Sequence, residues 1–122
     1  MIKILLADDE ADVREFLRDE LSDHHFYVNA VSNGAEAVIA ALDDAYDLYI
    51  LDMLMPGLDG IHTIKVLRKV TPRVPILGLT GYIGQGYMSQ ASAFDVNCLS
   101  KPIQIDDLIR EINEIVKVKK AA

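Results

Sequence analysis

The sequence predicts an α/β protein with a doubly wound parallel sheet of five strands and helices on both faces. Short β-rich runs alternate with helical patterns five times along the 122 residues, which is the pattern of such sheets. The first and third runs are almost entirely apolar, as expected for strands that are covered on both faces. A chain of this length forms one compact domain, so we expect a single domain over residues 1–122.

The predicted strands and helices follow one another in order. The strands are IKILLA (2–7), FYVNAV (26–31), DLYILD (47–52), PILGLT (75–80) and VNCLS (96–100). Between and after them, apolar residues recur at helical spacing, namely Val13, Phe16, Leu17 and Leu21, then Ile61, Ile64 and Leu67, and then Leu108, Ile112 and Ile115. Another helix is expected over 84–94, where three glycines near its start are also compatible with a mobile loop.

Several helix ends are marked by residues with a known preference for them. Asn33 followed by Glu36 predicts a variant of the capping box, which opens a helix that runs to about Leu42. Pro72 should end the third helix, because proline cannot continue one. Acidic residues at 106 and 107 fall in the first turn of the last helix, where the helix dipole favours them.

Composition excludes several classes of protein. The sequence is 51% hydrophobic and 25% charged, which is ordinary for a globular protein, and no apolar stretch approaches the about 20 residues of a membrane span. The net charge of -7 argues against direct nucleic-acid binding, which relies on clustered Lys and Arg. The KVKK run at 117–120 is typical of a helix end or could begin a linker. A single cysteine and no secretory pattern fit a reducing, cytoplasmic location.

Polar residues gather at the carboxyl ends of the predicted strands, which is where doubly wound sheets place their functional sites. Asp8 and Asp9 follow the first strand, Asp52 ends the third, Thr80 ends the fourth and Lys101 follows the fifth. In the order 2-1-3-4-5 of flavodoxin-like sheets, strands one and three are neighbours, so three carboxylates would converge. Asp is also common in helix caps and turns, and this alternative is the stronger one for Asp9 taken alone.

Three converging carboxylates repel one another unless a cation joins them. Mg²⁺ prefers oxygen ligands and is commonly shared with a phosphate. One Mg²⁺ and the Lys101 ammonium would bring the three carboxylates to a charge near zero. A phosphoryl group could then lie between the metal, Lys101 and the Thr80 hydroxyl, with Asp52 as the nucleophile that forms an acyl phosphate.

Four motifs in this arrangement strongly resemble the receiver domain of response regulators in two-component signalling systems. They are LLADDE (5–10), YILDMLMPGLDG (49–60), GLTGY (78–82) and LSKPI (99–103). The resemblance covers nearly the whole chain and is to the chemotaxis-type, flavodoxin-like receiver. It implies a phosphoprotein switch that takes a phosphoryl group from a histidine kinase or a histidine phosphotransfer protein.

The resemblance also implies roles for individual residues. Asp52 is the expected phosphoacceptor, Thr80 the switch hydroxyl and Lys101 the lysine that pairs with the phosphoryl group, with a cis peptide bond between Lys101 and Pro102. Asp9 is expected to be the more direct metal ligand of the acidic pair, and the full set of expected Mg²⁺ ligands is Asp8, Asp9, Asp52 and the backbone carbonyl of Leu54. Gly60 corresponds to the glycine after the turn, although a solvent turn would also favour glycine there.

The sequence departs from the family at two places. Cys98 stands where an aromatic residue three positions before the lysine usually turns inward, so the usual coupling between Thr80 and that aromatic cannot operate; a core thiol is the simplest role for Cys98. The segment GYIGQG after Thr80 is unusually rich in glycine, and we expect it to be flexible before phosphorylation and ordered afterwards. Tyr82 and Tyr87 in this region are either partner contacts or packing residues.

The residues at the strand ends are compatible with three classes of function to different degrees. The first is a switch with self-catalysed phosphorylation and dephosphorylation of Asp52, which changes affinity for a partner or output domain. The alternative is a non-phosphorylated receiver-like module that binds constitutively. Enzymes on the same sheet are rejected, because a haloacid-dehalogenase-type phosphatase would have an Asp at Leu54 and a flavodoxin a Ser/Thr/Gly-rich loop where this chain has DDEA. We expect a monomer or weak dimer.

Overall fold

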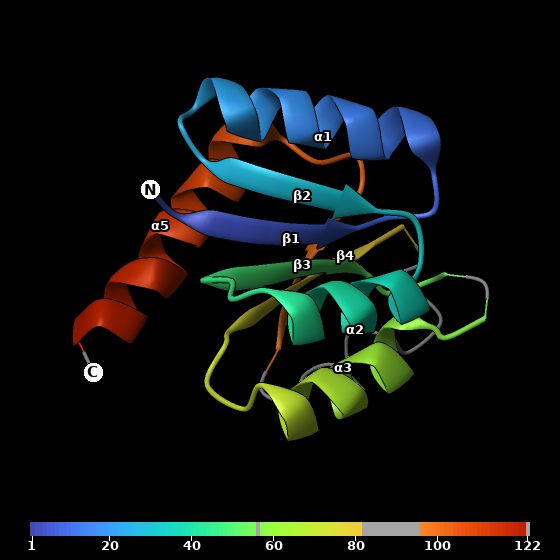
Figure 1. Cartoon of the computed structure of the whole chain (residues 1–122). Helices are drawn as coiled ribbons and strands as arrows, with labels where there is room; N and C mark the ends of the chain where they lie inside the picture. The colour runs from blue at the N-terminus through green and yellow to red at the C-terminus, as the bar shows by residue number, and fades with distance from the viewer. Residues whose placement is uncertain (56, 82–95, 122) are drawn as a thin grey trace.

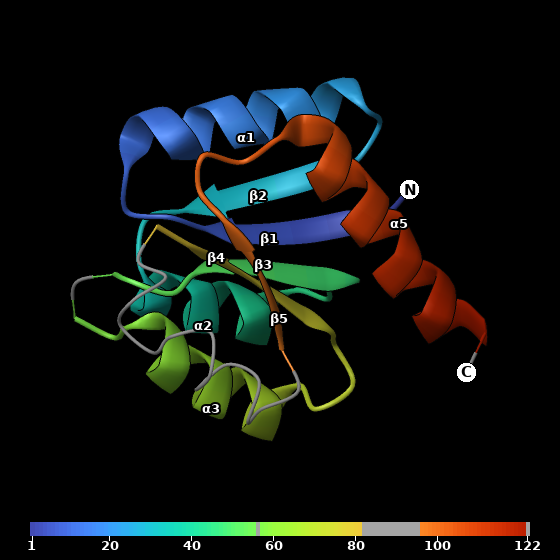
Figure 2. The same ribbon diagram turned by 180° about the vertical axis from the view of Figure 1, so that it is seen from behind.

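The predicted sheet is confirmed. The computed structural model of the chain describes residues 1–55, 57–81 and 96–121, with side chains of the last helix described to Lys117. The strands are β1 (Lys3–Ala7), β2 (Tyr27–Val31), β3 (Leu48–Asp52), β4 (Ile76–Thr80) and β5 (Asn97–Ser100). They lie in the order β2-β1-β3-β4-β5 and every neighbouring pair is parallel (Figures 1 and 2). Each strand is one residue shorter at its start than the sequence predicts.

Helices cover both faces of the sheet, as predicted. The four helices among the described residues are α1 (Ala11–Asp23), α2 (Gly34–Asp43), α3 (Gly60–Val70) and α5 (Ile105–Ala121). Helices α1 and α5 lie on one face, and α2 and α3 lie on the other (Figures 1 and 2). Some predictions fall outside the described residues, namely the helix over 84–94, most of the glycine-rich segment, and the roles of Tyr82 and Tyr87.

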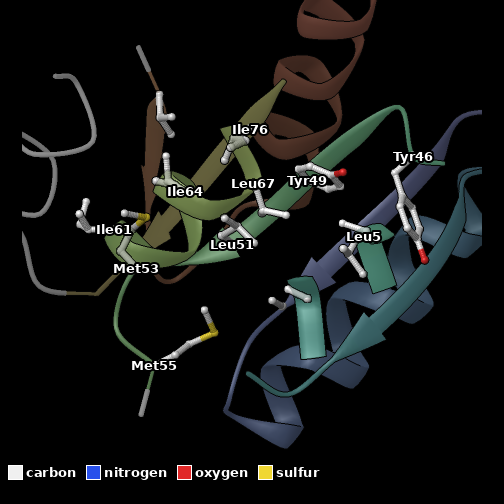
Figure 3. Packing of buried hydrophobic residues seen from close by; sticks show 14 residues of the cluster. Leu5, Tyr46, Tyr49, Leu51, Met53, Met55, Ile61, Ile64, Leu67 and Ile76 are labelled. Atoms are coloured by element: carbon white, nitrogen blue, oxygen red, sulfur yellow. The ribbon is translucent and has the colours of Figure 1, made fainter. Parts of the chain in front are cut away.

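The two faces of the sheet have separate apolar cores because side chains alternate along each strand. All five residues of β3 are buried. Tyr49 and Leu51 point into the core beneath α2 and α3, where Figure 3 shows them with Ile64 and Leu67. Leu48 and Ile50 enter the other core with α1 and α5. A strand buried on both faces carries its last side chain, that of Asp52, into a largely dry environment.

The predicted helix ends are found with one difference at the start of α2, and one residue of the predicted apolar stripe of α1 is exposed. Asn33 accepts a hydrogen bond from the Glu36 backbone N–H at 2.8 Å, but the returning bond comes from the N–H of Ser32 rather than that of Asn33. Helix α3 ends at Val70, before Pro72, and acidic residues fill the first turn of α5. Phe16 is 50% exposed, because it lies at the edge of the stripe that Leu17 and Leu21 form.

Candidate functional site

Two buried carboxylates lie at the carboxyl edge of the sheet. Strands β1 and β3 are neighbours in the sheet (Figure 1). They pair with Ala7 opposite Leu51, which brings Asp8 after β1 next to Asp52 at the end of β3. Both are almost inaccessible, at 0% and 3% exposure. The Glu10 N–H donates to Asp8 Oδ1 at 3.0 Å and the Leu54 N–H donates to Asp52 Oδ1 at 3.2 Å. Backbone turns that follow the two strands thus hold both carboxylates in place.

Lys101 reaches this pair from the far side of β4. Its backbone N–H donates to the Thr80 carbonyl oxygen at 2.8 Å, and the Lys101–Pro102 peptide bond is cis, as predicted. The ammonium Nζ lies 3.0 Å from Asp8 Oδ2, 3.0 Å from Glu10 Oε1 and 3.2 Å from Asp52 Oδ2. Three carboxylates from two segments of the chain therefore share one cation.

The remaining predicted residues surround the same place. The Thr80 side chain is fully buried at the end of β4, next to β3. A cavity of about 440 Å³ opens here and is lined by Asp9, Glu10, Asp52, Leu54, Met55, Gly81 and Lys101. A larger cavity of about 640 Å³, lined by residues such as Ile2, His25 and Asn113, has no group of three clustered metal-ligating side chains among the described residues.

Burial and repulsion control the protonation of Asp52. Burial, together with the nearby Asp8 carboxylate, raises the pKa of Asp52 to about 7, while the Leu54 N–H and the Lys101 ammonium oppose the change without cancelling it. For Lys101, burial acts to lower the pKa, but the contacts with Glu10, Asp8 and Asp52 outweigh it and raise the pKa above its usual value. The lysine is thus a permanent cation beside an acid that titrates near neutrality.

The donors fit a hard divalent cation. One oxygen from each of Asp8, Glu10 and Asp52 lies within 4.8 Å of the other two, and oxygen ligands are what Mg²⁺ prefers. Asp8 Oδ2 is buried without a hydrogen-bond partner among the described residues, because its contact with Lys101 is an ion pair without hydrogen-bond alignment. A buried oxygen in that condition has unused capacity for a cation.

The structure clusters Glu10, which the sequence did not single out, with Asp8 and Asp52, whereas the role expected of Asp9 stays a prediction. Asp9 is exposed and lines the cavity, but its carboxylate lies outside the cluster. Glu10 contributes the third carboxylate in its place. The signal was present in LLADDE, which contains three acidic residues in succession, but the spacing alone does not say which of them turn inward.

Two features shape the surroundings of the site. Gly60 lies against the end of β3, so that a Cβ there would be 2.5 Å from Met53 Cα and 3.0 Å from the Asp52 carbonyl oxygen; a close approach, rather than a solvent turn, requires this glycine. Cys98 is half-buried in β5 opposite Gly78 and packs against the core beneath α2 and α3. Burial raises the pKa of its thiol, which agrees with the predicted packing role.

No helix among the described residues is long and apolar enough to cross a membrane.

The sequence matches the response regulator receiver domain over residues 4–113. It is 32% identical over 117 residues to the response regulator receiver protein CpdR of Brucella abortus, covering 95% of this chain and 98% of that protein. It is 38% identical over 120 residues to the transcriptional regulatory protein CpxR homolog of Haemophilus influenzae, covering 96% of this chain and 51% of that protein.

The structure resembles that of the response regulator protein TrrA of Thermotoga maritima, which was solved in complex with Mg²⁺ and BeF. The TM-score is 0.85 at 31% sequence identity, and the match covers 94% of this chain and 99% of that one. The chain thus has nearly the same length as some relatives and spans about half of others such as the CpxR homolog.

Proposed function

Because the chain belongs to the response regulator receiver domain family of two-component systems, we propose that Asp52 accepts a phosphoryl group in a magnesium-dependent transfer. The observation that carries the proposal is the setting of Asp52. Its carboxylate is buried at a strand end, lies 3.2 Å from a lysine ammonium and shares a cluster with two other carboxylates. An acid in this setting can be both nucleophile and metal ligand.

The metal ligands would be Asp8, Asp9, Asp52 and the backbone carbonyl of Leu54, with Glu10 at the mouth of the site. Bound Mg²⁺ would supply positive charge beside phosphoryl oxygens and would favour the ionised form of Asp52 at neutral pH. Asp8 Oδ2, which is buried and accepts no hydrogen bond among the described residues, supports this assignment. Asp9 would ligate the metal directly by turning its exposed side chain inward across the cavity.

The transfer itself needs a nucleophile and well-placed charge. An Asp52 carboxylate oxygen attacks phosphorus, the new P–O bond forms, and the bond from phosphorus to the donor's imidazole nitrogen breaks with its electron pair left on the ring. Lys101 then pairs with the phosphoryl oxygens and the Thr80 hydroxyl donates to one of them. The donor class is a histidine kinase or a histidine phosphotransfer protein. Hydrolysis of the acyl phosphate returns the switch to its first state.

Phosphorylation would change the affinity of the domain for an output domain or a downstream protein. We propose one domain over residues 1–122, acting in the cytoplasm as a monomer or weak dimer, without direct nucleic-acid contact or turnover of a separate substrate. Cys98, in place of the usual aromatic, gives one reason to keep the alternative of a constitutive binding module. Loss of signalling in Asp52→Asn would support the switch over that alternative.

Intact mass after incubation with acetyl phosphate tests the transfer. We expect one added phosphoryl group that requires both Mg²⁺ and Asp52, so that Asp52→Ala and metal-free samples stay unmodified. If the folded wild-type protein gains no mass and also fails to bind beryllofluoride with Mg²⁺, the switch is refuted and the constitutive module remains.

A further inference from the structure

Glu10 occupies an unusual position for a glutamate. It is the N-cap residue of α1, yet its side chain makes no capping hydrogen bond, and residues at this position usually use a short side chain to cap the helix. The Glu10 carboxylate instead accepts a hydrogen bond from Lys101 Nζ at 3.0 Å, across 91 positions of sequence. Its backbone N–H is held by Asp8 Oδ1. Both the backbone N–H and the side-chain carboxylate of Glu10 are therefore hydrogen-bonded to residues of the site.

The Lys101 ammonium lies among three carboxylates. It carries three N–H donors, and one oxygen each of Asp8, Glu10 and Asp52 lies within 3.2 Å of it. The contacts with Glu10 and Asp52 are hydrogen bonds and the contact with Asp8 is an ion pair, so an oxyanion that arrives at Asp52 competes with three carboxylates for one ammonium. The carboxylate contacts that Lys101 makes before phosphorylation therefore affect how tightly an oxyanion binds at Asp52.

The three partners are not equally easy to displace. The side chains of Asp8 and Asp52 are 0% and 5% exposed, whereas that of Glu10 is 60% exposed. A carboxylate that leaves its partner is stabilised by water only where water can reach it, and a buried one pays the full cost of an unpaired charge. Glu10 is the partner that can release Lys101 at the smallest cost.

We propose that Glu10 is a positioning residue that holds Lys101 in the unphosphorylated protein and yields the lysine to the phosphoryl oxygens. The inference rests on the proposed phosphorylation of Asp52 and adds that the Glu10 carboxylate competes with the phosphoryl oxygens for Lys101. Glu10 also lines the cavity through which an anionic group must approach, so its charge opposes that approach. Removing the carboxylate should make the site bind a phosphoryl analogue more tightly.

Beryllofluoride at saturating Mg²⁺ is the probe, and its binding is followed through amide resonances in NMR spectra. We expect Glu10→Gln to bind it about two- to fivefold more tightly than wild type, the factor that corresponds to one partly exposed ion pair. Glu15→Gln removes an equal charge from an exposed position of α1 and should bind as wild type does. Mg²⁺ is titrated separately for each variant, so that saturation is known.

A second variant separates contact from charge. Glu10→Asp keeps the charge but is one methylene too short to preserve the 3.0 Å contact, so it should shift toward the tighter binding of Glu10→Gln. The side-chain resonances of Lys101 give a direct readout: they should move in Glu10→Gln without any ligand and stay in place in Glu15→Gln.

The outcomes are distinguishable. If wild type binds beryllofluoride and Glu10→Gln binds it equally or more weakly, the role of Glu10 is refuted and the proposed function stands. Wild-type affinity in Glu10→Asp, or unchanged Lys101 resonances in Glu10→Gln, also overturns it. Failure of the wild-type protein to bind beryllofluoride overturns the role of Glu10, and failure to gain mass from acetyl phosphate as well overturns the proposed function.

Discussion

Replacing Asp52 by asparagine should make the stability of the protein less dependent on pH. Burial and the Asp8 carboxylate raise the pKa of Asp52 from 3.8 to about 7 in the folded chain, whereas the unfolded chain has the ordinary value. One pKa unit corresponds to about 1.4 kcal/mol, so the full displacement sets an upper limit of about 4 kcal/mol. Between pH 5 and 8.5 the wild-type free energy of unfolding would fall by about 2 to 3 kcal/mol through this group. Screening by water in the cavity should reduce the fall to about 1 to 3 kcal/mol.

The sign follows from where the proton is held. Between the two pKa values the folded protein keeps a proton on Asp52 and the unfolded chain does not, so the wild-type free energy of unfolding falls as pH rises toward about 7. The side-chain amide of the variant cannot titrate, so the variant does not lose this stability. Relative to wild type, Asp52→Asn should therefore gain about 1 to 3 kcal/mol between pH 5 and 8.5 and change little above that.

Urea unfolding at several pH values from 5 to 9, without divalent metal, measures this difference. Asp43→Asn removes an exposed carboxylate from α2 and reports the effect of net charge alone. Added Mg²⁺ should reduce the advantage of the variant, because a bound cation stabilises the ionised carboxylate that the amide lacks. A difference between wild type and Asp52→Asn that is constant with pH, or that shrinks as pH rises, would refute the reasoning.

Three further changes test the packing by urea unfolding. Gly60→Ala should cost about 2 to 3 kcal/mol, because its Cβ would meet Met53 Cα at 2.5 Å; a loss below about 0.5 kcal/mol contradicts this. Asn33→Ala should cost about 1 kcal/mol through loss of the N-cap of α2, and an unchanged midpoint would be the contrary result. Gly78→Ala should cost about 1 to 2 kcal/mol because a Cβ would lie 2.5 Å from Cys98 Sγ, and less in a Cys98→Ala background; strict additivity of the two changes would show that they do not interact.

Much of the site could be predicted because parallel strands place their carboxyl ends at one edge. That rule alone brings Asp8, Asp52, Thr80 and Lys101 together, and the register of the sheet confirms that their strands end there. The rule says nothing about residues after a strand has ended. Glu10 lies at a junction where the side-chain period changes from 2 to 3.6, and its inward direction depends on the backbone turn before α1.

A similar limit applies to the helices. The apolar spacing that includes Phe16 predicts α1 correctly, but the width of its buried stripe depends on how closely α5 and the sheet approach. Leu17 and Leu21 are covered, whereas Phe16 is half exposed. Likewise, Cys98 could be predicted to pack in the core, but its close contact with Gly78 depends on the pairing of β4 with β5.

The long-range contacts of Lys101 also have a consequence during synthesis of the protein. Lys101 meets Glu10 and Asp52 across 91 and 49 positions of sequence, and its backbone is held by the last residue of β4. A nascent chain that has released only its first four strands exposes the acidic cluster without the lysine. The site can form only after β5 has left the ribosome and joined the sheet, so a nascent receiver cannot assemble it before almost the whole domain has been made.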